Sequence, residues 1–145
     1  MELIRATLQD IHALLDIEKT AEGKKTYSGY FNEKEIEDWI CRDVVYLIKN
    51  NGSVVGSISY EVKSATNVYI SGLIIKPEFQ KQGVAKFAML ELLKELKRFK
   101  RLDLVVHPDN IGAIKLYNSL GFETESLKEN YFSDGEPRLL MIKIT

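Results

Sequence analysis

Residues 80–86, with the sequence QKQGVAK, place small residues just before a helical pattern. At a strand–loop–helix turn the first backbone N–H groups of the helix point at one spot, where the helix dipole also favours negative charge. Gly83 and Ala85 are small enough to let a pyrophosphate approach the backbone. The segment therefore predicts an anion site, although an ordinary glycine turn has a similar composition. Neither G-x-x-x-x-G-K-[ST] nor G-x-G-x-x-G is present, which disfavours nucleoside triphosphates and dinucleotides.

A second group of residues shares one face of a later helical pattern. Asn110, Ala113 and Tyr117 recur at i, i+3 and i+7, so they lie on the same side of a helix. A buried face would seldom contain both an asparagine and a tyrosine. Asn110 is either an N-terminal capping residue or a ligand-binding residue, and Tyr117 is either a core aromatic residue or a proton donor. This pattern alone leaves both choices open.

Taken together, the two motifs resemble those of a known enzyme superfamily. Q-x-x-G-x-A at residues 80–85, followed by N-x-x-A-x-x-x-Y-x-x-x-G-F at residues 110–122, is similar to the two central motifs of the GNAT acyl-CoA N-acyltransferases. The resemblance extends from Val54 to Thr145. Residues 129–135 (ENYFSDG), together with Leu140 and Met141, are similar to the tail of RimI-type protein N-terminal acetyltransferases.

The resemblance implies a reaction and a place for its co-substrate. In this superfamily acetyl-CoA lies where two central strands separate, and a primary amine attacks its thioester directly. A backbone N–H of the strand would polarise the thioester carbonyl, and Tyr117 would correspond to the general acid that protonates the departing thiolate. The implied acetyl-CoA-binding residues are Leu73, Ile74 and Ile75 on the strand, Lys81, Gln82, Gly83, Val84, Ala85 and Lys86 in the loop, and Asn110 and Tyr117.

The general base that the resemblance leads us to expect is missing. RimI-type enzymes carry a glutamate on the strand before the asparagine of the second motif, where this chain has Val105, and an apolar side chain accepts no proton. Strand alternation places Asp103, Val105 and His107 on one face, which makes His107 one candidate base. Tyr69 is the other, because other branches of the superfamily place a base acting through water at about this position. A surface role for His107 and a core role for Tyr69 are the structural alternatives.

The acceptor amine follows less directly from the sequence. An α-amine of pKa about 7.7–8.0 is about 15% neutral at pH 7, whereas a lysine side chain is only about 0.04% neutral, so a site without the glutamate should favour an α-amine. Tyr30, Phe31 and Tyr131 are expected to line a groove for a peptide N-terminus. A small-molecule amine, such as a polyamine, an amino acid or an antibiotic, is the alternative acceptor. A non-catalytic acyl-CoA-binding domain is a further alternative, against which the retained Tyr117 argues.

These residues must be positioned by alternating strands and helices. A strand at residues 3–6 leads to two helices, which begin at the capping pairs Thr7 with Asp10 and Asn32 with Glu35. Residues 44–49, 54–62 and 67–75 indicate an antiparallel meander, followed by a helix at 83–99 and a strand at 102–106. A helix at 110–120 and a hairpin of residues 122–127 and 139–144 complete the order β-α-α-β-β-β-α-β-α-β-β. This order predicts an α/β (α+β) fold with a mixed, mostly antiparallel sheet flanked by helices.

Composition limits the remaining possibilities. The 145 residues are 45% hydrophobic and 28% charged with a net charge of −1, which favours a single domain spanning residues 1–145 and argues against nucleic-acid binding. No apolar run is long enough to cross a membrane, and the first residues lack a signal-peptide pattern, so we expect a cytoplasmic protein. The lone Cys41 and the isolated His12 and His107 predict no metal site. Nothing in the sequence decides between a monomer and a homodimer.

Overall fold

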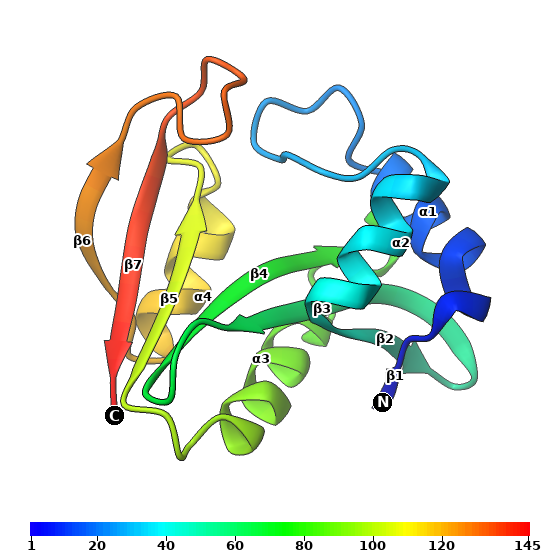
Figure 1. The fold of residues 1–145 in the computed structure, drawn as a ribbon, viewed down its shortest axis with the longest axis horizontal. Helices are drawn as coiled ribbons and strands as arrows, with labels where there is room; N and C mark the ends of the chain where they lie inside the picture. Colours follow the sequence, from blue (N-terminus) through cyan, green and yellow to red (C-terminus); the bar gives the residue numbers. More distant parts are fainter.

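The sheet of this protein is mixed and mostly antiparallel. In the computed structural model, which describes residues 1–145, seven strands form one sheet in the order β1-β2-β3-β4-β5-β7-β6 (Figure 1). Only β4 and β5 run parallel, and every other neighbouring pair is antiparallel. The predicted sheet is therefore confirmed. The strands are β1 (Glu2–Arg5), β2 (Val44–Asn50), β3 (Ser53–Val62), β4 (Asn67–Ile75), β5 (Arg101–Val106), β6 (Glu123–Lys128) and β7 (Arg138–Ile144).

Four α-helices cover the two faces of this sheet. Val45 and Leu47 of β2 pack with α1 and α2, whereas Tyr46 and Ile48 pack with the cluster that contains residues of α3 and α4. Side chains alternate between the two faces along a strand, so the two pairs of helices cover opposite faces. Even the longest helix, α3, has only 12 residues, which is too few for a membrane-spanning helix. The helices are α1 (Ile11–Lys19), α2 (Glu33–Arg42), α3 (Val84–Glu95) and α4 (Ile111–Ser119), with short 3-10 turns at Leu8–Asp10 and Pro77–Phe79.

The helix starts follow the capping residues in the sequence. The backbone N–H of Thr7 donates to Asp10 at 2.8 Å, and the Asn32 side chain accepts from the backbone N–H of Glu35 at 2.9 Å. Both predicted capping pairs are confirmed. The end of α3 differs from the prediction, because the helix stops at Glu95 and residues 96–99 form a turn that brings Phe99 into the core.

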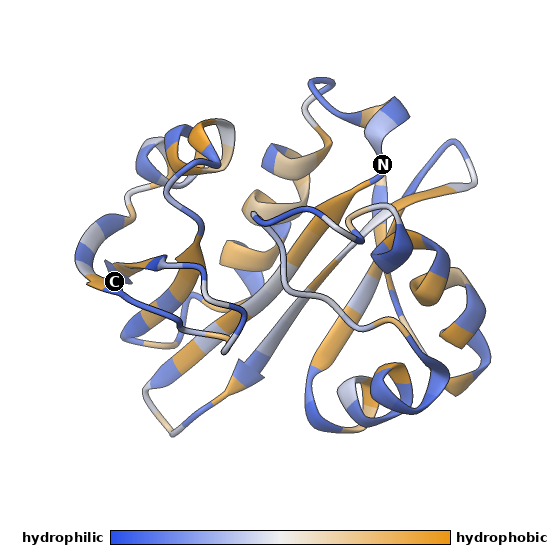
Figure 2. Cartoon of the chain, turned by 90° about the horizontal axis from the view of Figure 1, so that it is seen from above, coloured by the Kyte–Doolittle hydropathy of each residue, from blue (hydrophilic) through white to orange (hydrophobic).

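Hydropathy follows the same arrangement. Figure 2 shows hydrophobic colour along the central strands and alternating colour on the helices, whereas most of the connecting loops are hydrophilic. Alternation on a helix is typical of an element with one face in the core and the other in water. The buried side chains of α1 and α3 accordingly lie on their sheet-facing sides.

The central strands β4 and β5 separate along most of their length. They pair only from Asn67 opposite Arg101 to Tyr69 opposite Asp103. In the ladder with β3, Ser59 lies opposite Gly72 and Tyr60 opposite Ile70, so the register leaves Ser71 as an extra residue on β4. An extra residue of this kind bends its strand. The sheet therefore opens between the second half of β4 and β5 (Figure 1).

Candidate active site

A single cavity of about 640 Å³ occupies the opening between β4 and β5. Most residues predicted from the sequence lie in its wall, although they come from distant parts of the chain. Val105 lies there as well, so the position of the expected glutamate faces the cavity with an apolar side chain. The predicted residues in the wall are Tyr30, Tyr69, Leu73, Ile74, Ile75, Lys81, Gly83, Val84, Ala85, Lys86, His107, Asn110 and Tyr117.

Three predicted residues do not line the cavity. The side chain of Gln82 turns back along the loop, and its amide nitrogen donates to the carbonyl oxygen of Glu78 at 3.1 Å. Phe31 packs beside Gly29, which does line the cavity. Tyr131 is 41% exposed and packs edge-on against Phe132, with ring centroids 4.7 Å apart. Of these two aromatic neighbours it is Phe132 that reaches the cavity wall.

The loop before α3 has the geometry of an anion site. Gly83 is the N-terminal capping residue of α3 and adopts a φ of 81°, a left-handed conformation that glycine takes without strain. A Cβ atom at Gly83 would meet no other atom within 4 Å, so the space beside this backbone is open. The first intrahelical bond runs from the N–H of Phe87 to the carbonyl of Gly83, at 3.0 Å. The N–H groups of Val84, Ala85 and Lys86 precede it and are free to bind an anion.

The second half of β4 offers backbone donors toward β5. The N–H of Lys76 donates to the carbonyl of Val55, beyond the end of the β3–β4 ladder, at 2.9 Å. Successive N–H groups of a strand point to opposite sides. The N–H groups of Leu73 and Ile75 therefore point toward the gap, where the β4–β5 ladder no longer provides partners. An extended ligand in the gap would meet these donors.

Helix α4 presents Asn110 and Tyr117 to the cavity. The Asn110 side-chain oxygen accepts from the backbone N–H of Ala113 at 3.3 Å, so this residue caps the helix, and its amide nitrogen donates to no protein group. At the other end, Gly121 has a φ of 93°, and the N–H of Phe122 donates to the carbonyl of Tyr117 at 3.0 Å. This arrangement is a Schellman motif, which fixes the Tyr117 ring against Phe122 with centroids 6.1 Å apart.

The Tyr117 side chain is suited to donate a proton. It is only 8% exposed, and its hydroxyl hydrogen bonds to no protein group. Burial raises the pKa of Tyr117 well above the ordinary value of 10, with a smaller contribution from Tyr27. The hydroxyl therefore keeps its proton at neutral pH.

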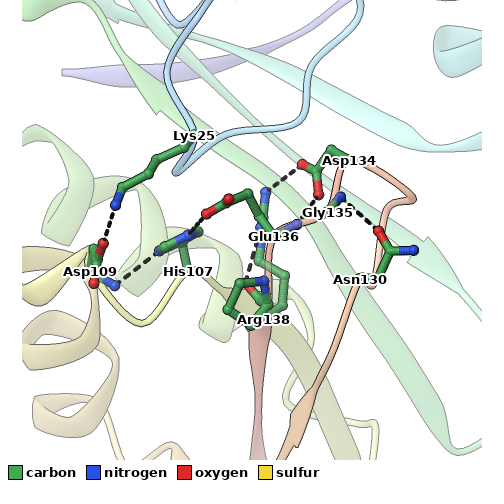
Figure 3. Close-up of polar contacts among 9 residues, drawn as sticks. Lys25, His107, Asp109, Asn130, Asp134, Gly135, Glu136 and Arg138 are labelled. Atoms are coloured by element: carbon green, nitrogen blue, oxygen red, sulfur yellow. Dashed lines mark hydrogen bonds and ion pairs between the residues drawn. The ribbon is translucent and has the colours of Figure 1, made fainter.

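His107 is held by contacts on both ring nitrogens. It is 3% exposed; Nδ1 accepts from the backbone N–H of Asp109 at 3.0 Å, and Nε2 lies 2.7 Å from Oε1 of Glu136 (Figure 3). Because Nδ1 accepts, this hydrogen-bond pattern assigns the ring proton to Nε2, which donates to Glu136. Neither nitrogen has a free lone pair for the proton of an amine. His107 is therefore buried and bonded, and not the surface residue that one alternative describes.

Tyr69 projects from β4 at the point where β4 and β5 separate. Burial raises the pKa of Tyr69, and the neighbouring Tyr131 raises it further. The phenol is neutral at physiological pH, so it can orient a water molecule but cannot itself take the proton of an ammonium group.

Several polar residues of the cavity have no counterpart in the sequence prediction. Burial raises the pKa of the Glu18 carboxyl from 4.5 to about 7, against a smaller opposing effect of the Tyr30 backbone amide. Asp43 accepts from Arg42 Nε at 2.9 Å and from the Ser71 hydroxyl at 2.6 Å. The sequence does contain a signal for Glu18, because this residue lies one turn after Leu14 on the apolar side of α1. Polar residues rarely occupy such positions without a role.

The loops around the opening are joined to each other by ion pairs. Lys25, in the loop between α1 and α2, lies 2.7 Å from Asp109, in the loop between β5 and α4. Asp134, in the loop between β6 and β7, pairs at 3.3 Å with Arg138, the first residue of β7, beside the His107–Glu136 contact (Figure 3). In Figure 1 the α1–α2 loop and the β6–β7 loop face each other above the gap. Both loops therefore limit access to the cavity.

Comparison with known proteins assigns this architecture to a family. The model of the acetyltransferase (GNAT) family matches residues 8–122, which include both motifs in full. This chain belongs to the GNAT family. The predicted superfamily and fold are thereby confirmed, and the protein is an acetyl-CoA-dependent N-acetyltransferase.

Relatives of this GNAT chain act on different amines. The [ribosomal protein bS18]-alanine N-acetyltransferase of Escherichia coli is 25% identical, over 89% of this chain and 85% of the relative. A spermidine N(1)-acetyltransferase of Thermoplasma acidophilum is 24% identical, over 86% of this chain and 89% of the relative. Among solved structures, Ard1 from Thermoplasma volcanium superposes with a TM-score of 0.82 and 26% identity, covering 99% of this chain and 97% of that one.

Proposed function

We propose that this GNAT enzyme acetylates the α-amine of a peptide or protein N-terminus. The observation that carries the proposal is one continuous cavity that runs from the Gly83 loop, past Tyr117, to Tyr30 and Tyr69. Such a cavity can hold an acyl-CoA arm at one end and an extended acceptor at the other. The reaction needs the two substrates to meet in this way, because the acetyl group passes directly from sulfur to nitrogen.

The end of the cavity at α3 is suited to the CoA moiety. The free N–H groups of Val84 to Lys86 would bind the pyrophosphate, and the N–H groups of Leu73 and Ile75 would bind the pantetheine arm. A free N–H on the same edge of β4 would polarise the thioester carbonyl. Tyr117 would give its proton to the departing sulfur, a role that suits a phenol whose burial keeps it protonated.

The opposite end is suited to an acceptor that carries a peptide bond. Tyr30 and Phe132 enter the cavity wall from the two loops that face each other across the gap. An α-amine is neutral more often than a side-chain amine at pH 7, and so asks less of a site in which Val105 replaces the glutamate. The similarity to the [ribosomal protein bS18]-alanine N-acetyltransferase of Escherichia coli supports the same choice.

A small polycationic amine is the second candidate acceptor. Three carboxylates, those of Glu18, Asp43 and Glu61, line the acceptor end. A spermidine acetyltransferase is also among the relatives. A carboxylate-rich pocket would attract a polyamine, so a test must include both kinds of amine.

The deciding experiment measures thiol release from acetyl-CoA with a panel of acceptors. The panel contains short peptides with free N-termini, the same peptides with blocked N-termini, spermidine and free lysine. We expect turnover on free N-termini and none on the blocked forms. Turnover on spermidine alone would contradict the peptide acceptor and leave the acetyltransferase chemistry in place.

A further inference from the structure

The acceptor end of the cavity contains a carboxylate that no protein group neutralises. Glu18 is 4% exposed, and its side chain forms part of the cavity wall. Its Oε2 atom is buried without a hydrogen-bond partner. A buried carboxylate normally has a cation or several donors, because an unpaired buried charge is costly. The Glu18 carboxylate has no cation within ion-pair distance.

The neighbouring charged groups already have partners and cannot serve Glu18. The Arg42 guanidinium bonds to Asp43 at 2.9 Å and to the Tyr30 hydroxyl at 2.7 Å. Glu61 pairs with Lys63 at 3.0 Å. Glu18 is therefore the one carboxylate of this end that lacks a cation, and a ligand is the remaining source of one.

The position of the Glu18 carboxylate is fixed by the loop that passes over it. A Cβ atom built at Gly29 would lie 2.6 Å from Glu18 Oε2 and 3.1 Å from the Phe31 ring. The loop between α1 and α2 can pass this close to the Glu18 carboxylate because Gly29 has no side chain. Glu18 is thus held beneath the loop that covers the acceptor end.

We propose that the Glu18 carboxylate binds the ammonium group of the acceptor and takes its proton. This inference rests on the proposed function, since it concerns the amine of the same reaction. The structure leaves this role vacant elsewhere: Val105 has no titratable group, both nitrogens of His107 are engaged, and the Tyr69 phenol is neutral. A carboxyl group whose affinity for protons is raised by burial is matched to this task at neutral pH.

The proposed step balances in protons and electrons. The ammonium gives one proton to Glu18, which then releases it to solvent. The lone pair of the neutral amine forms the C–N bond at the thioester carbonyl, and the C–S bond breaks with its electron pair going to sulfur. Tyr117 protonates this thiolate, and the second proton of the nitrogen replaces the one that Tyr117 has given up.

Replacing Glu18 by glutamine tests the proposal, because glutamine keeps the shape and removes the base. With the acceptor peptide of highest turnover, we expect Glu18→Gln to lower kcat/KM by about 100- to 10,000-fold while the Kd for acetyl-CoA stays within twofold. The matched control is Glu37→Gln, which removes an exposed carboxylate of α2 outside the cavity and should leave both values unchanged. A kcat/KM for Glu18→Gln within threefold of wild type would overturn the inference.

A pH profile separates proton transfer from a structural role. Without a base, kcat/KM of Glu18→Gln should rise with pH in proportion to the neutral fraction of the acceptor amine, whereas wild type should level off above the titration of Glu18. A reduced activity with an unchanged profile would assign Glu18 to structure and overturn the inference. Both proteins share the other titratable or charged groups of the cavity outside its CoA end. These are Tyr27 and Tyr30 from the α1–α2 loop, Arg42 and Asp43 from the end of α2, Glu61 from β3, Tyr69 from β4, His107 after β5 and Arg138 at the start of β7.

A second variant keeps the inference testable if the glutamine protein is unstable. Gly29→Ala should displace the carboxylate and lower kcat/KM for the peptide without changing acetyl-CoA binding. Wild-type turnover by this variant, with the same KM for the peptide, would argue against the role of Glu18. If the wild-type enzyme acetylates no amine of the panel, both the proposed function and this inference fail. If the wild-type enzyme is active and Glu18→Gln is equally active, only this inference fails.

Discussion

At the scale of single residues, the cavity contains two groups whose protonation is set by burial. Tyr117 is shifted toward its neutral form and Glu18 toward its protonated form, both mainly by desolvation. The two groups lie in different parts of the same cavity wall, on α4 and α1. One can supply a proton to the sulfur, and the other can receive a proton from the amine.

Removing the Tyr117 hydroxyl should slow the reaction without weakening the complex. We expect Tyr117→Phe to lower kcat by about 10- to 1000-fold, because general acids contribute roughly this much. The Kd for acetyl-CoA, measured by calorimetry, should not change, since the ring keeps its contact with Phe122. Tyr46→Phe is the matched control, because the Tyr46 hydroxyl bonds to Glu95 outside the cavity. Wild-type kcat for Tyr117→Phe would make the hydroxyl a purely structural group.

The Glu18 carboxylate should lower the stability of the folded protein at high pH. Burial raises the pKa of Glu18 from 4.5 to about 7. Between pH 4.5 and 7 the carboxyl group is therefore protonated in the folded protein and ionised in the unfolded chain. The stabilising effect of the protonated form is complete below pH 4.5 and is lost as the pH rises through 7. At pH 8 the cost is on the order of 3 kcal/mol in the free energy of unfolding.

Glu18→Gln should therefore be more stable than wild type at pH 8 and equally stable near pH 4. Urea unfolding at the two pH values measures this difference, with Glu37→Gln as the control for general charge effects. A variant less stable than wild type at pH 8 would mean that the carboxylate holds the fold together. A Glu18→Gln protein that is more stable and less active than wild type is the expected result, because functional groups often reduce the stability of the folded protein.

At the scale of elements, the sequence predicted what depends on local chemistry. The pairs Thr7 with Asp10 and Asn32 with Glu35 cap helices because their side chains reach backbone N–H groups three residues away. Gly121 ends α4 because a residue with a φ of 93° is needed there. The order of strands and helices followed from hydrophobic periodicity for the same reason.

Contacts between distant segments could not be predicted in this way. The bond from His107 to Glu136 joins the residue directly after β5 to a loop far along the chain, and no local pattern signals it. The separation of β4 from β5 depends on an extra residue in the ladder with β3, which hydropathy does not reveal. The assignment of Tyr117 to the cavity came from the family resemblance, because its helix position alone also fits a core residue.

The turn before α3 gives a prediction with a closely matched control. Gly83→Val should abolish CoA binding, because the side chain would fill the open space beside the free N–H groups. Gly52→Val introduces the same side chain at the same kind of position, with a φ of 80° and no atom within 4 Å, in the turn between β2 and β3. We expect this control to bind CoA like wild type in calorimetry. Equal CoA affinity of both variants would contradict the anion site.

The contact between His107 and Glu136 should order the β6–β7 loop. We expect Glu136→Ala to increase hydrogen exchange in residues 129–137 and to raise the KM for the acceptor, because Phe132 of this loop lines the acceptor end. Glu129→Ala removes an exposed carboxylate of the same loop and serves as the control. Unchanged exchange in Glu136→Ala would show that the contact does not hold the loop.

At the scale of the whole molecule, the two parts of the sheet share one hydrophobic cluster but pair with each other over only a short stretch at its centre. The strands from β1 to β4 and the group of β5, β6 and β7 are joined in the sheet only by the short pairing of residues 67–69 with 101–103. Beyond this pairing, the Lys25–Asp109 ion pair connects loops across the opening and is exposed to solvent. Exposed ion pairs stabilise little. That residues 1–145 form a single domain stays a prediction.

A ligand in the gap would bond to the free edge of β4 and contact the β5 side at the same time, so it should stabilise the molecule as a whole. At a concentration of 100 times its Kd, CoA should raise the free energy of unfolding by about 2.7 kcal/mol, which corresponds to an increase in Tm of roughly 5–10 °C for a chain of this size.

Hydrogen exchange in the CoA complex should slow at the N–H groups of Leu73 and Ile75 as well as in residues 83–86, because both donor sets would be bonded. Gly83→Val should lose the increase in Tm, since it lacks the site for the pyrophosphate. Protection confined to residues 83–86, with unchanged exchange in β4, would mean that CoA binds only at the helix terminus and does not connect the two parts of the sheet.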